Sequence, residues 1–332
     1  MSIKRELLQR VDRKTDPFYR LVKQKLSEDL KQIPDNAIRI ADRSDAPDGA
    51  QIVEGERGGL AYVPENGESE SEEGSGTSAA VPDRPTETVE AWDEKHSEAI
   101  QTQAEKHDMS EEEYREAVSD EYSRIIENSQ AAVRVPSDVL SDVLSDGRVK
   151  TQFETGESGG WFDPSLRSEF EEALIGVDEG TSDEDRPVYG YAASEEPTTE
   201  GESRMLQMYG DASIRLSDDA KERSTVTYGD SMNANRDWFD RDGDIITAPA
   251  PANNPDERTL DISSVPRGAD GDTYLEFLQN SDDPTDFGTY NEMQIHGGVS
   301  VEDIEQVVFT SDPPQEIVSQ LEAQGIEFEV DA

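Results

Sequence analysis

Residues 240–244 form the most recognisable cluster of chemically active side chains in this sequence. The segment (DRDGD) places carboxylates at the first, third and fifth positions of a calcium-binding loop. The sixth position should be Gly and is Ile245, and the twelfth should be a bidentate Glu and is Pro251. In a chain with 77 Asp and Glu residues, such a cluster arises readily by chance. We therefore predict no metal site, with calcium at Asp240–Asp244 as the minor alternative.

A second group of polar side chains falls on three predicted strands and one turn. Its members are Arg134, Ser224, Thr225, Thr227, Asp230, Glu292 and Gln294. Each also has an ordinary explanation, because Arg134 can pair with an acid and Thr-rich composition is common in strands. Glu292 is one of 77 acids, so only its surrounding motif sets it apart.

Cysteine and histidine content narrows the chemistry further. The chain has no Cys, which excludes disulfides, thiolate zinc sites and a Cys nucleophile. His96 and His107 lie eleven residues apart on a predicted helix, and we expect both to be surface residues. His296 is expected to be structural. Residues 156–160 are rich in Gly but lack the Lys of a phosphate-binding loop.

The second half of the chain must position the polar group on strands. Strands are predicted at 131–135, 188–192, 213–216, 224–228, 292–296, 304–309 and 326–330. Short helices are predicted at 136–144, closed by Gly147, at 165–174, and at 317–324, closed by Gly325. A parallel βα fold needs a helix between successive strands, and most of these are missing. The pattern therefore predicts an α+β fold with a mixed β-sandwich over 131–332.

The N-terminal part divides into three regions. Residues 1–64 contain a predicted helix at 16–33 and a hairpin at 45–65, and residues 1–40 carry a net charge of +4. The basic helix is expected either to dock on an acidic partner or to pack on its own domain. Residues 65–90 are expected to be a flexible acidic linker. Residues 91–130 are predicted to be helical, with an apolar stripe from Met109 to Ile126.

The formal net charge of −47 limits the partners of the chain. Such a charge with 33% hydrophobic residues is typical of disorder or of a protein adapted to very high salt. The strand and helix patterns argue against disorder and therefore favour salt adaptation. In molar salt the Debye length falls to ~3 Å, so the acidic residues of a folded chain repel one another far less than in dilute buffer. Salt cations are then the expected counter-ions. A body this acidic is a poor match for nucleic acid, and no apolar run approaches the ~18 residues of a membrane span.

Four segments of the second half resemble the mono-ADP-ribosyltransferase-like domain of some tailed-virus minor head proteins of the MuF type. They are AAVRVPSDVLSDVLSDGRVKTQFETGESGG, RPVYGYA, YGDASIRLSDDAKERSTVTYGDS and YNEMQIHGGVSVEDIEQVVF. Their order is similar to that of the family, with an Arg on an early strand, then a Ser/Thr strand, then a Glu-bearing strand. The composition resembles that of haloarchaeal proteins and their viruses.

The resemblance implies that NAD is the substrate and that it is cleaved through an oxocarbenium-like ribosyl cation. Glu292 would be the catalytic carboxylate, and Arg134 would contact the pyrophosphate, with Arg148 and Arg186 as rival phosphate ligands. The rest of the cofactor-binding set would be Ser224, Thr225, Thr227 and Asp230.

One departure from the family pattern bears on activity. Active members commonly place an acid or Gln two residues before the catalytic Glu, whereas here Glu292 itself precedes Gln294. If Gln294 occupies the catalytic position, the domain is inactive. Both residues are therefore candidates for the catalytic site, and whether the chain is an enzyme stays open at this point.

The expected function is that of a minor head or virion-associated protein of a halophilic tailed virus. Its ADP-ribosyltransferase-like domain would transfer ADP-ribose from NAD to a protein, with a host protein as the acceptor. Portal or capsid proteins are the expected partners of residues 1–64. The expected location is the head or portal region of the virion, and the host cytoplasm during assembly. The first alternative is an inactive structural or assembly protein with the same fold. The second, which the sequence supports less, is a host-encoded toxin-like transferase.

Overall fold

The computed structural model describes residues 38–40, 51–54, 60–63, 81–158, 162–199, 202–235, 245–263, 265–266, 271–287 and 289–331. They belong to two compact units, Met1–Ser75 and Gly76–Ala332. The helix predicted at 16–33 lies outside the described residues, as do most of the predicted linker and the acidic cluster at 240–244.

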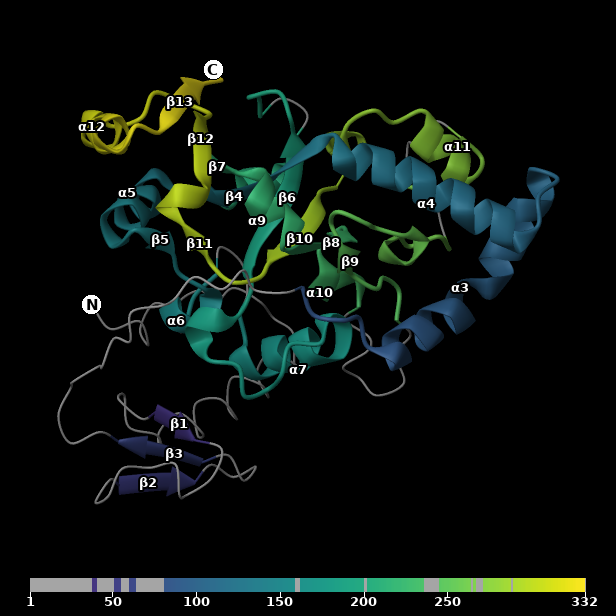
Figure 1. Cartoon of the computed structure of the whole chain (residues 1–332), viewed down its shortest axis with the longest axis horizontal. Helices are drawn as coiled ribbons and strands as arrows, with labels where there is room; N and C mark the ends of the chain where they lie inside the picture. The colour runs from purple at the N-terminus through teal and green to yellow at the C-terminus, as the bar shows by residue number, and fades with distance from the viewer. Residues whose placement is uncertain are drawn as a thin grey trace, which may run out of the picture. The chain divides into compact units, whose positions relative to one another are not determined.

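In the first unit, three short strands form an antiparallel sheet in the order β1-β3-β2 (Figure 1). β2 (Gln51–Glu54) and β3 (Leu60–Val63) are the predicted hairpin, with Ile52 opposite Tyr62. β1 (Ile38–Ile40) pairs with the other side of β3 and is too short to produce a recognisable sequence pattern.

The second unit is built around one mixed sheet of eight strands (Figure 1). The strands are β4 (Ser129–Val135), β6 (Val188–Ser194), β7 (Ala212–Leu216), β8 (Ser224–Tyr228), β9 (Ala250–Pro251), β10 (Asn291–Ile295), β12 (Ile304–Phe309) and β13 (Glu327–Val330). Their order is β13-β12-β7-β4-β6-β10-β8-β9, and only the β12–β13 pair is parallel among these described strands. All seven predicted strands are confirmed. β5 (Arg148–Val149) and β11 (Val299–Ser300) form a separate two-stranded sheet.

The helices of this unit surround the sheet. They are α3 (Thr86–Lys106), α4 (Glu111–Glu127), α5 (Ser137–Asp146), α6 (Gln152–Thr155), α7 (Pro164–Ile175), α8 (Arg204–Gln207), α9 (Asp218–Glu222), α10 (Ser231–Ala234), α11 (Tyr274–Gln279) and α12 (Gln315–Gln324). The predicted stops of α5 and α12 are confirmed, since Gly147 and Gly325 adopt left-handed φ values of 81° and 74°. α3 begins inside the stretch predicted as linker. Met109, predicted to lie in the apolar stripe, precedes α4 and is 37% exposed. The expectation that His96 is a surface residue is wrong, because it is buried on α3 with Nε2 at 2.9 Å from the carbonyl oxygen of Ile246.

The layers differ from the predicted β-sandwich. The eight strands hydrogen-bond side by side in one sheet. Helices supply the second layer, because the main apolar core joins one face of the sheet to buried residues of α3, α4, α5, α11 and α12. The sequence pattern located the strands correctly and did not show that helices, rather than a second sheet, cover this face.

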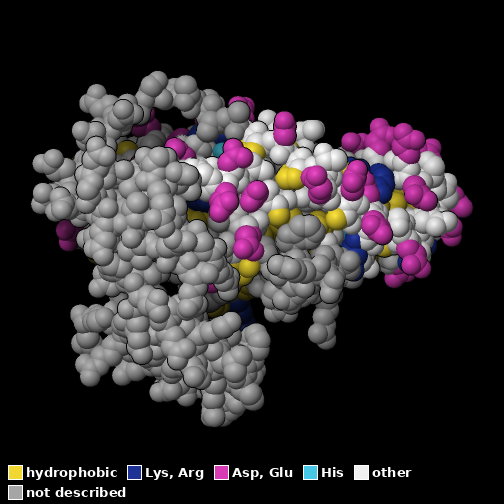
Figure 2. Space-filling view, turned by 90° about the horizontal axis from the view of Figure 1, so that it is seen from below, with side chains coloured by type: hydrophobic (Ala, Val, Ile, Leu, Met, Phe, Trp, Pro, Cys, Tyr) yellow, Lys and Arg dark blue, Asp and Glu magenta, His cyan; other side chains and the backbone are white. Residues whose placement is uncertain are grey.

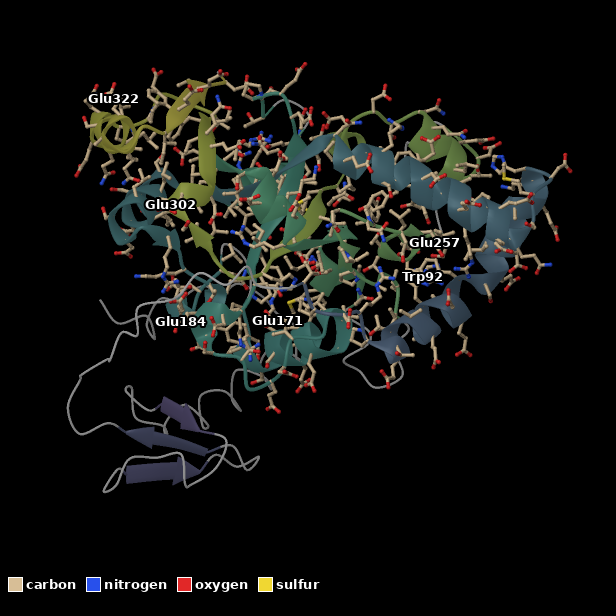
Figure 3. All side chains as sticks on the ribbon, in the orientation of Figure 1. Trp92, Glu171, Glu184, Glu257, Glu302 and Glu322 are labelled. Atoms are coloured by element: carbon tan, nitrogen blue, oxygen red, sulfur yellow. The ribbon has the colours of Figure 1, made fainter. Side chains whose placement is uncertain are left out.

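Charged side chains around Trp92 connect α3 and α4 to the segment that contains Glu257 and Arg258 (Figure 3). The guanidinium groups of Arg115 and Arg258 lie 5.5 and 5.9 Å from the centre of the Trp92 ring. Arg115 Nη1 also bonds Asp93 at 2.9 Å and Glu257 at 2.8 Å, and Figure 3 labels Glu257 beside Trp92. The helical segment predicted at 91–130 therefore packs within the same compact unit as the sheet.

Acidic side chains cover much of the outer surface of this unit. Figure 2 shows Asp and Glu distributed over the visible described residues, with many at the end where α3 and α4 meet. Lys and Arg are sparse on the same face. No described helix has both the length and the apolar character needed to cross a membrane.

Candidate functional site

The two faces of the sheet differ in polarity, and the candidate residues lie on the polar one. Along β10, Met293 and Ile295 belong to the main apolar core, so the alternating residues Glu292 and Gln294 lie on the opposite face. On β8, Val226 belongs to the same core. All four alternating polar residues are nonetheless buried, which is unusual for a sheet face; they are Thr225, Thr227, Glu292 and Gln294.

Cross-strand register brings the predicted Ser/Thr strand and Glu strand together. Glu292 lies opposite Thr227, and Gln294 lies opposite Thr225. Directly opposite residues on one face of an antiparallel pair have Cβ atoms about 5 Å apart. On the other side of β10, the residues opposite Glu292 and Gln294 are Tyr191 and Tyr189.

Glu292 is the central carboxylate of this face and is only 5% exposed. Its Oε1 accepts hydrogen bonds from the Ser231 hydroxyl and, at 2.9 Å, from Nε2 of Gln294. No described residue donates to Oε2. Burial raises the pKa of this carboxyl to about 7; the charge of Asp230 adds to the rise, and that of Arg167 opposes it. A carboxyl with this pKa can both give and take a proton near neutral pH.

Gln294 is held from its other end by Thr225. The Thr225 hydroxyl donates to Oε1 of Gln294 at 2.6 Å, which orients Nε2 of the amide toward Glu292. The same hydroxyl lies 3.3 Å from Nε2 of His296. Burial lowers the pKa of His296 to about 4, so this imidazole is neutral at pH 7. His296 follows β10 directly and is buried.

Asp230 and Ser231 act on Glu292 from the start of α10. Oδ1 of Asp230 accepts the backbone N–H groups of Met232 at 3.0 Å and Asn233 at 3.2 Å, which caps the helix. The cap fixes the turn after β8 and places the Ser231 hydroxyl on Glu292. Asp230 is half-buried, and its charge favours the neutral form of the Glu292 carboxyl.

The predicted site residues of β8 lie on two different faces of the sheet, because side chains alternate along a strand. Oγ1 of Thr227 is buried beside Glu292 and has no hydrogen-bond partner among the described residues. Ser224, in contrast, donates to the carbonyl of Ala220 at 2.7 Å and lies on the apolar face. The structure therefore brings Thr225 and Thr227 to the site and does not bring Ser224.

Arg134 lies on the polar face but is engaged in a buried ion network. It forms an ion pair with Glu202, and its Nε donates to the carbonyl of Gly210 at 2.9 Å. Glu202 also accepts from Tyr191 at 2.7 Å and from Arg215 at 3.4 Å. The side chains of Arg134 and Glu202 are each only 1% exposed. The observed contacts of Arg134 are therefore those of the structural alternative, in which this residue pairs with an acid.

The two rival phosphate ligands are also paired with acids. Arg148 contacts Glu154 at 2.9 Å through Nη1 and is 38% exposed. Arg186 contacts Glu171 at 2.6 Å and Ser168 at 3.1 Å, both within the buried interior. In the part of the chain that the structure describes, no group of three or more His, Asp or Glu side chains could hold a metal ion.

Arg167 on α7 is a site residue that the sequence interpretation missed. It is 7% exposed and lies 4.1 Å from the centre of the Tyr189 ring. Its Nε and Nη1 have no hydrogen-bond partner in the described structure. The sequence offers no signal that singles out Arg167, because an Arg four residues before a Glu on a helix is also the pattern of an exposed ion pair, and the burial of both is seen only in the structure.

Comparison with known proteins identifies the relatives of this chain. No family model matches the sequence. The Gene 2 protein of Mycobacterium phage L5 is 32% identical over 218 residues, which cover 64% of this chain and 77% of that protein. The Gene 2 protein of Mycobacterium phage D29 is 29% identical over 221 residues, covering 66% of this chain and 78% of that protein. The chain therefore belongs to the family of the mycobacteriophage Gene 2 proteins.

Proposed function

We propose that this chain is a virion-associated phage protein whose second unit carries an ADP-ribosyltransferase-like site for NAD. The observation that carries the proposal is the buried row in which Glu292 lies opposite Thr227 and beside Gln294. This row agrees with the strand order of the resembled family. The single mixed sheet is compatible with that resemblance without being specific to it.

The carboxylate of this site suits cleavage of the bond between ribose and nicotinamide in NAD. The bond between ribose C1 and the nicotinamide nitrogen breaks, and its electron pair leaves with nicotinamide. An acceptor nucleophile then bonds to C1 and releases a proton. The ionised Oε2 of Glu292, which accepts no hydrogen bond from a described residue, stabilises the positive charge that develops on the ribose. Activity would therefore rise through pH 7, as Glu292 ionises.

A second candidate is a catalytically inactive binding or assembly module. The bond from Thr225 to Gln294 favours it, because a Ser or Thr that orients the catalytic carboxylate in the resembled family would here orient an amide. An amide carries no charge and cannot stabilise a ribosyl cation as a carboxylate does.

Nicotinamide release from labelled NAD separates the two candidates. The full chain is assayed in molar KCl beside Glu292→Gln, Gln294→Glu and a control, Glu322→Gln, at an exposed position on α12 (Figure 3). The proposal expects release by the wild type and the control, and a loss of about a hundredfold or more in Glu292→Gln. Release by Gln294→Glu alone would favour the inactive module. Equal release by wild type and Glu292→Gln would overturn the catalytic role.

The place in the particle rests on the phage relatives and on the basic N-terminus. Residues 1–64 would attach the chain to portal or capsid proteins in the head or portal region, after assembly in the host cytoplasm. The phage relatives make a host-encoded transferase the weaker alternative. Mass spectrometry of purified particles tests the location, and absence of the chain from them would reject it.

We further propose that the virus that encodes this chain is halophilic and infects haloarchaea. The support for this proposal is the net charge of −47 and the acidic surface, since such charge is tolerated best where salt screens it.

A further inference from the structure

The polar face of the sheet contains an excess of positive charge in a strongly acidic chain. The buried Arg residues of this layer are Arg134, Arg167, Arg186 and Arg215, and its buried Glu residues are Glu171, Glu202 and Glu292. Four guanidinium groups thus face three carboxyl groups. One of these, Glu292, is neutral for part of the time near pH 7. Buried charges are stable when they are paired, and the fully buried residues that the structure describes in this layer include one more guanidinium than carboxyl group, with the half-buried Asp230 as a further carboxylate near Glu292.

Among the described buried guanidinium groups of this layer, that of Arg167 differs from the others in its partners. Arg134 and Arg215 both contact Glu202, and Arg186 contacts Glu171. Both oxygens of Glu171 are occupied, by Arg186 at 2.6 Å and by the Tyr189 hydroxyl at 2.8 Å. Arg167 is therefore the one member of this set of four without a described carboxylate in hydrogen-bond contact.

The position of Arg167 keeps it charged and oriented. Its guanidinium is stacked on Tyr189, whose backbone lies opposite Gln294 of β10. Its charge also interacts with Glu292. The two unpartnered donors, Nε and Nη1, are different nitrogens of one rigid planar guanidinium group. Donors that point in two directions match a ligand with several anionic oxygens better than a single carboxylate does.

We infer that Arg167 binds the phosphoryl oxygens of the ligand at this site, and that the ligand class is a pyrophosphate-containing nucleotide. The inference rests on the proposed function for the identity of the nucleotide, but not for the presence of an anion site. It gives the phosphate-binding role to Arg167 on α7 and leaves Arg134 as the core of a structural ion network.

Calorimetric titration of the full chain in molar KCl tests the inference with three probes: ADP-ribose, inorganic pyrophosphate and inorganic phosphate. We expect ADP-ribose and pyrophosphate to bind more tightly than phosphate. Arg167→Gln should weaken both by about tenfold or more, because a charge-assisted bond to a buried anion is lost. Arg148→Gln, which removes the same charge at a half-exposed rival, should leave the affinities within about twofold.

Arg167→Lys keeps the charge and replaces the planar fork with a single ammonium, so it decides the question even if Arg167→Gln does not fold. It should bind pyrophosphate more weakly than the wild type. Equal affinity of wild type and Arg167→Lys, or no binding of any probe by the wild type, would overturn the inference. Arg167-dependent pyrophosphate binding without nicotinamide release would support the anion site and reject the transferase. Nicotinamide release by Arg167→Lys with an unchanged KM for NAD would support the transferase and reject the anion site at Arg167.

Discussion

Gln294 donates from Nε2 to Oε1 of Glu292 at 2.9 Å, so a neutral amide is fixed against a buried carboxyl on the same face of β10. The amide in turn accepts from Thr225 at 2.6 Å, which makes the three side chains one connected unit. Because all three are buried, the protonation state of Glu292 depends on few and identifiable groups.

Glu292 should make the stability of the fold depend on pH. The pKa of its carboxyl is about 7 in the folded chain and 4.5 when unperturbed, so the folded state favours the protonated form. Its contribution is complete below about pH 4.5 and is lost as pH rises through about 7. The difference corresponds to roughly 3 kcal/mol. Denaturant unfolding at several pH values should show this decline in the wild type and not in Glu292→Gln, whereas parallel curves for the two proteins would contradict it.

Thr225→Val should disturb Glu292 through Gln294. The substitution leaves the buried Oε1 of Gln294 without its donor, which should lower the free energy of unfolding by about 1–3 kcal/mol. The amide is then free to turn away from Glu292, so the pKa of that carboxyl should rise further. Ser224→Ala is the matched control, because Ser224 bonds Ala220 on the opposite face. It should cost stability without moving the pH dependence, and an equal effect of both variants on that dependence would refute the coupling.

Local patterns were sufficient to predict seven of the eight strands of the large sheet and the helices α5, α7 and α12, whereas β9 and the short helices α6, α8, α9, α10 and α11 were not predicted. β8 and β12 occur at their predicted bounds, because a short run rich in β-branched residues between turn signals determines its own conformation. The layer arrangement was not predictable in this way. Which face a helix covers depends on contacts between distant residues, such as the bond from the Tyr122 hydroxyl to Asn291 at 3.0 Å.

The site was predictable only where strand register carries the information. The sequence analysis grouped Ser224 with Thr225 and Thr227 and did not apply the alternation of side chains along β8, which places Ser224 on the opposite face. Arg167 could not be found, because its proximity to Glu292 depends on the packing of α7 against Tyr189, a contact between distant residues. The partners of Arg134 were likewise hidden, since Glu202 lies in an irregular segment 68 residues later.

Glu202→Gln should be among the most destabilising single changes in the second unit. It leaves Arg134 and Arg215 buried without a counter-ion, and removing one partner of a buried pair costs about 3–5 kcal/mol. Glu154→Gln, which breaks the partly exposed pair with Arg148, should cost less than about 1 kcal/mol. Guanidinium chloride adds salt, so urea is the appropriate denaturant. Equal losses in the two variants would show that the Glu202 network contributes no more than a surface pair.

The stability of the whole chain should increase with salt, because a net charge of −47 repels itself across the acidic surface. Raising KCl from about 0.1 to 1 M shortens the Debye length from ~10 to ~3 Å, which screens most of that repulsion. We expect a gain of a few kcal/mol, or about 10 °C in Tm by calorimetry. Sucrose at matched osmolality favours compact states without screening and should stabilise the chain less. The deficit of Glu202→Gln should persist in molar KCl, since that network is shielded from solvent; a Tm independent of salt would instead mean that the acidic surface is not a salt adaptation.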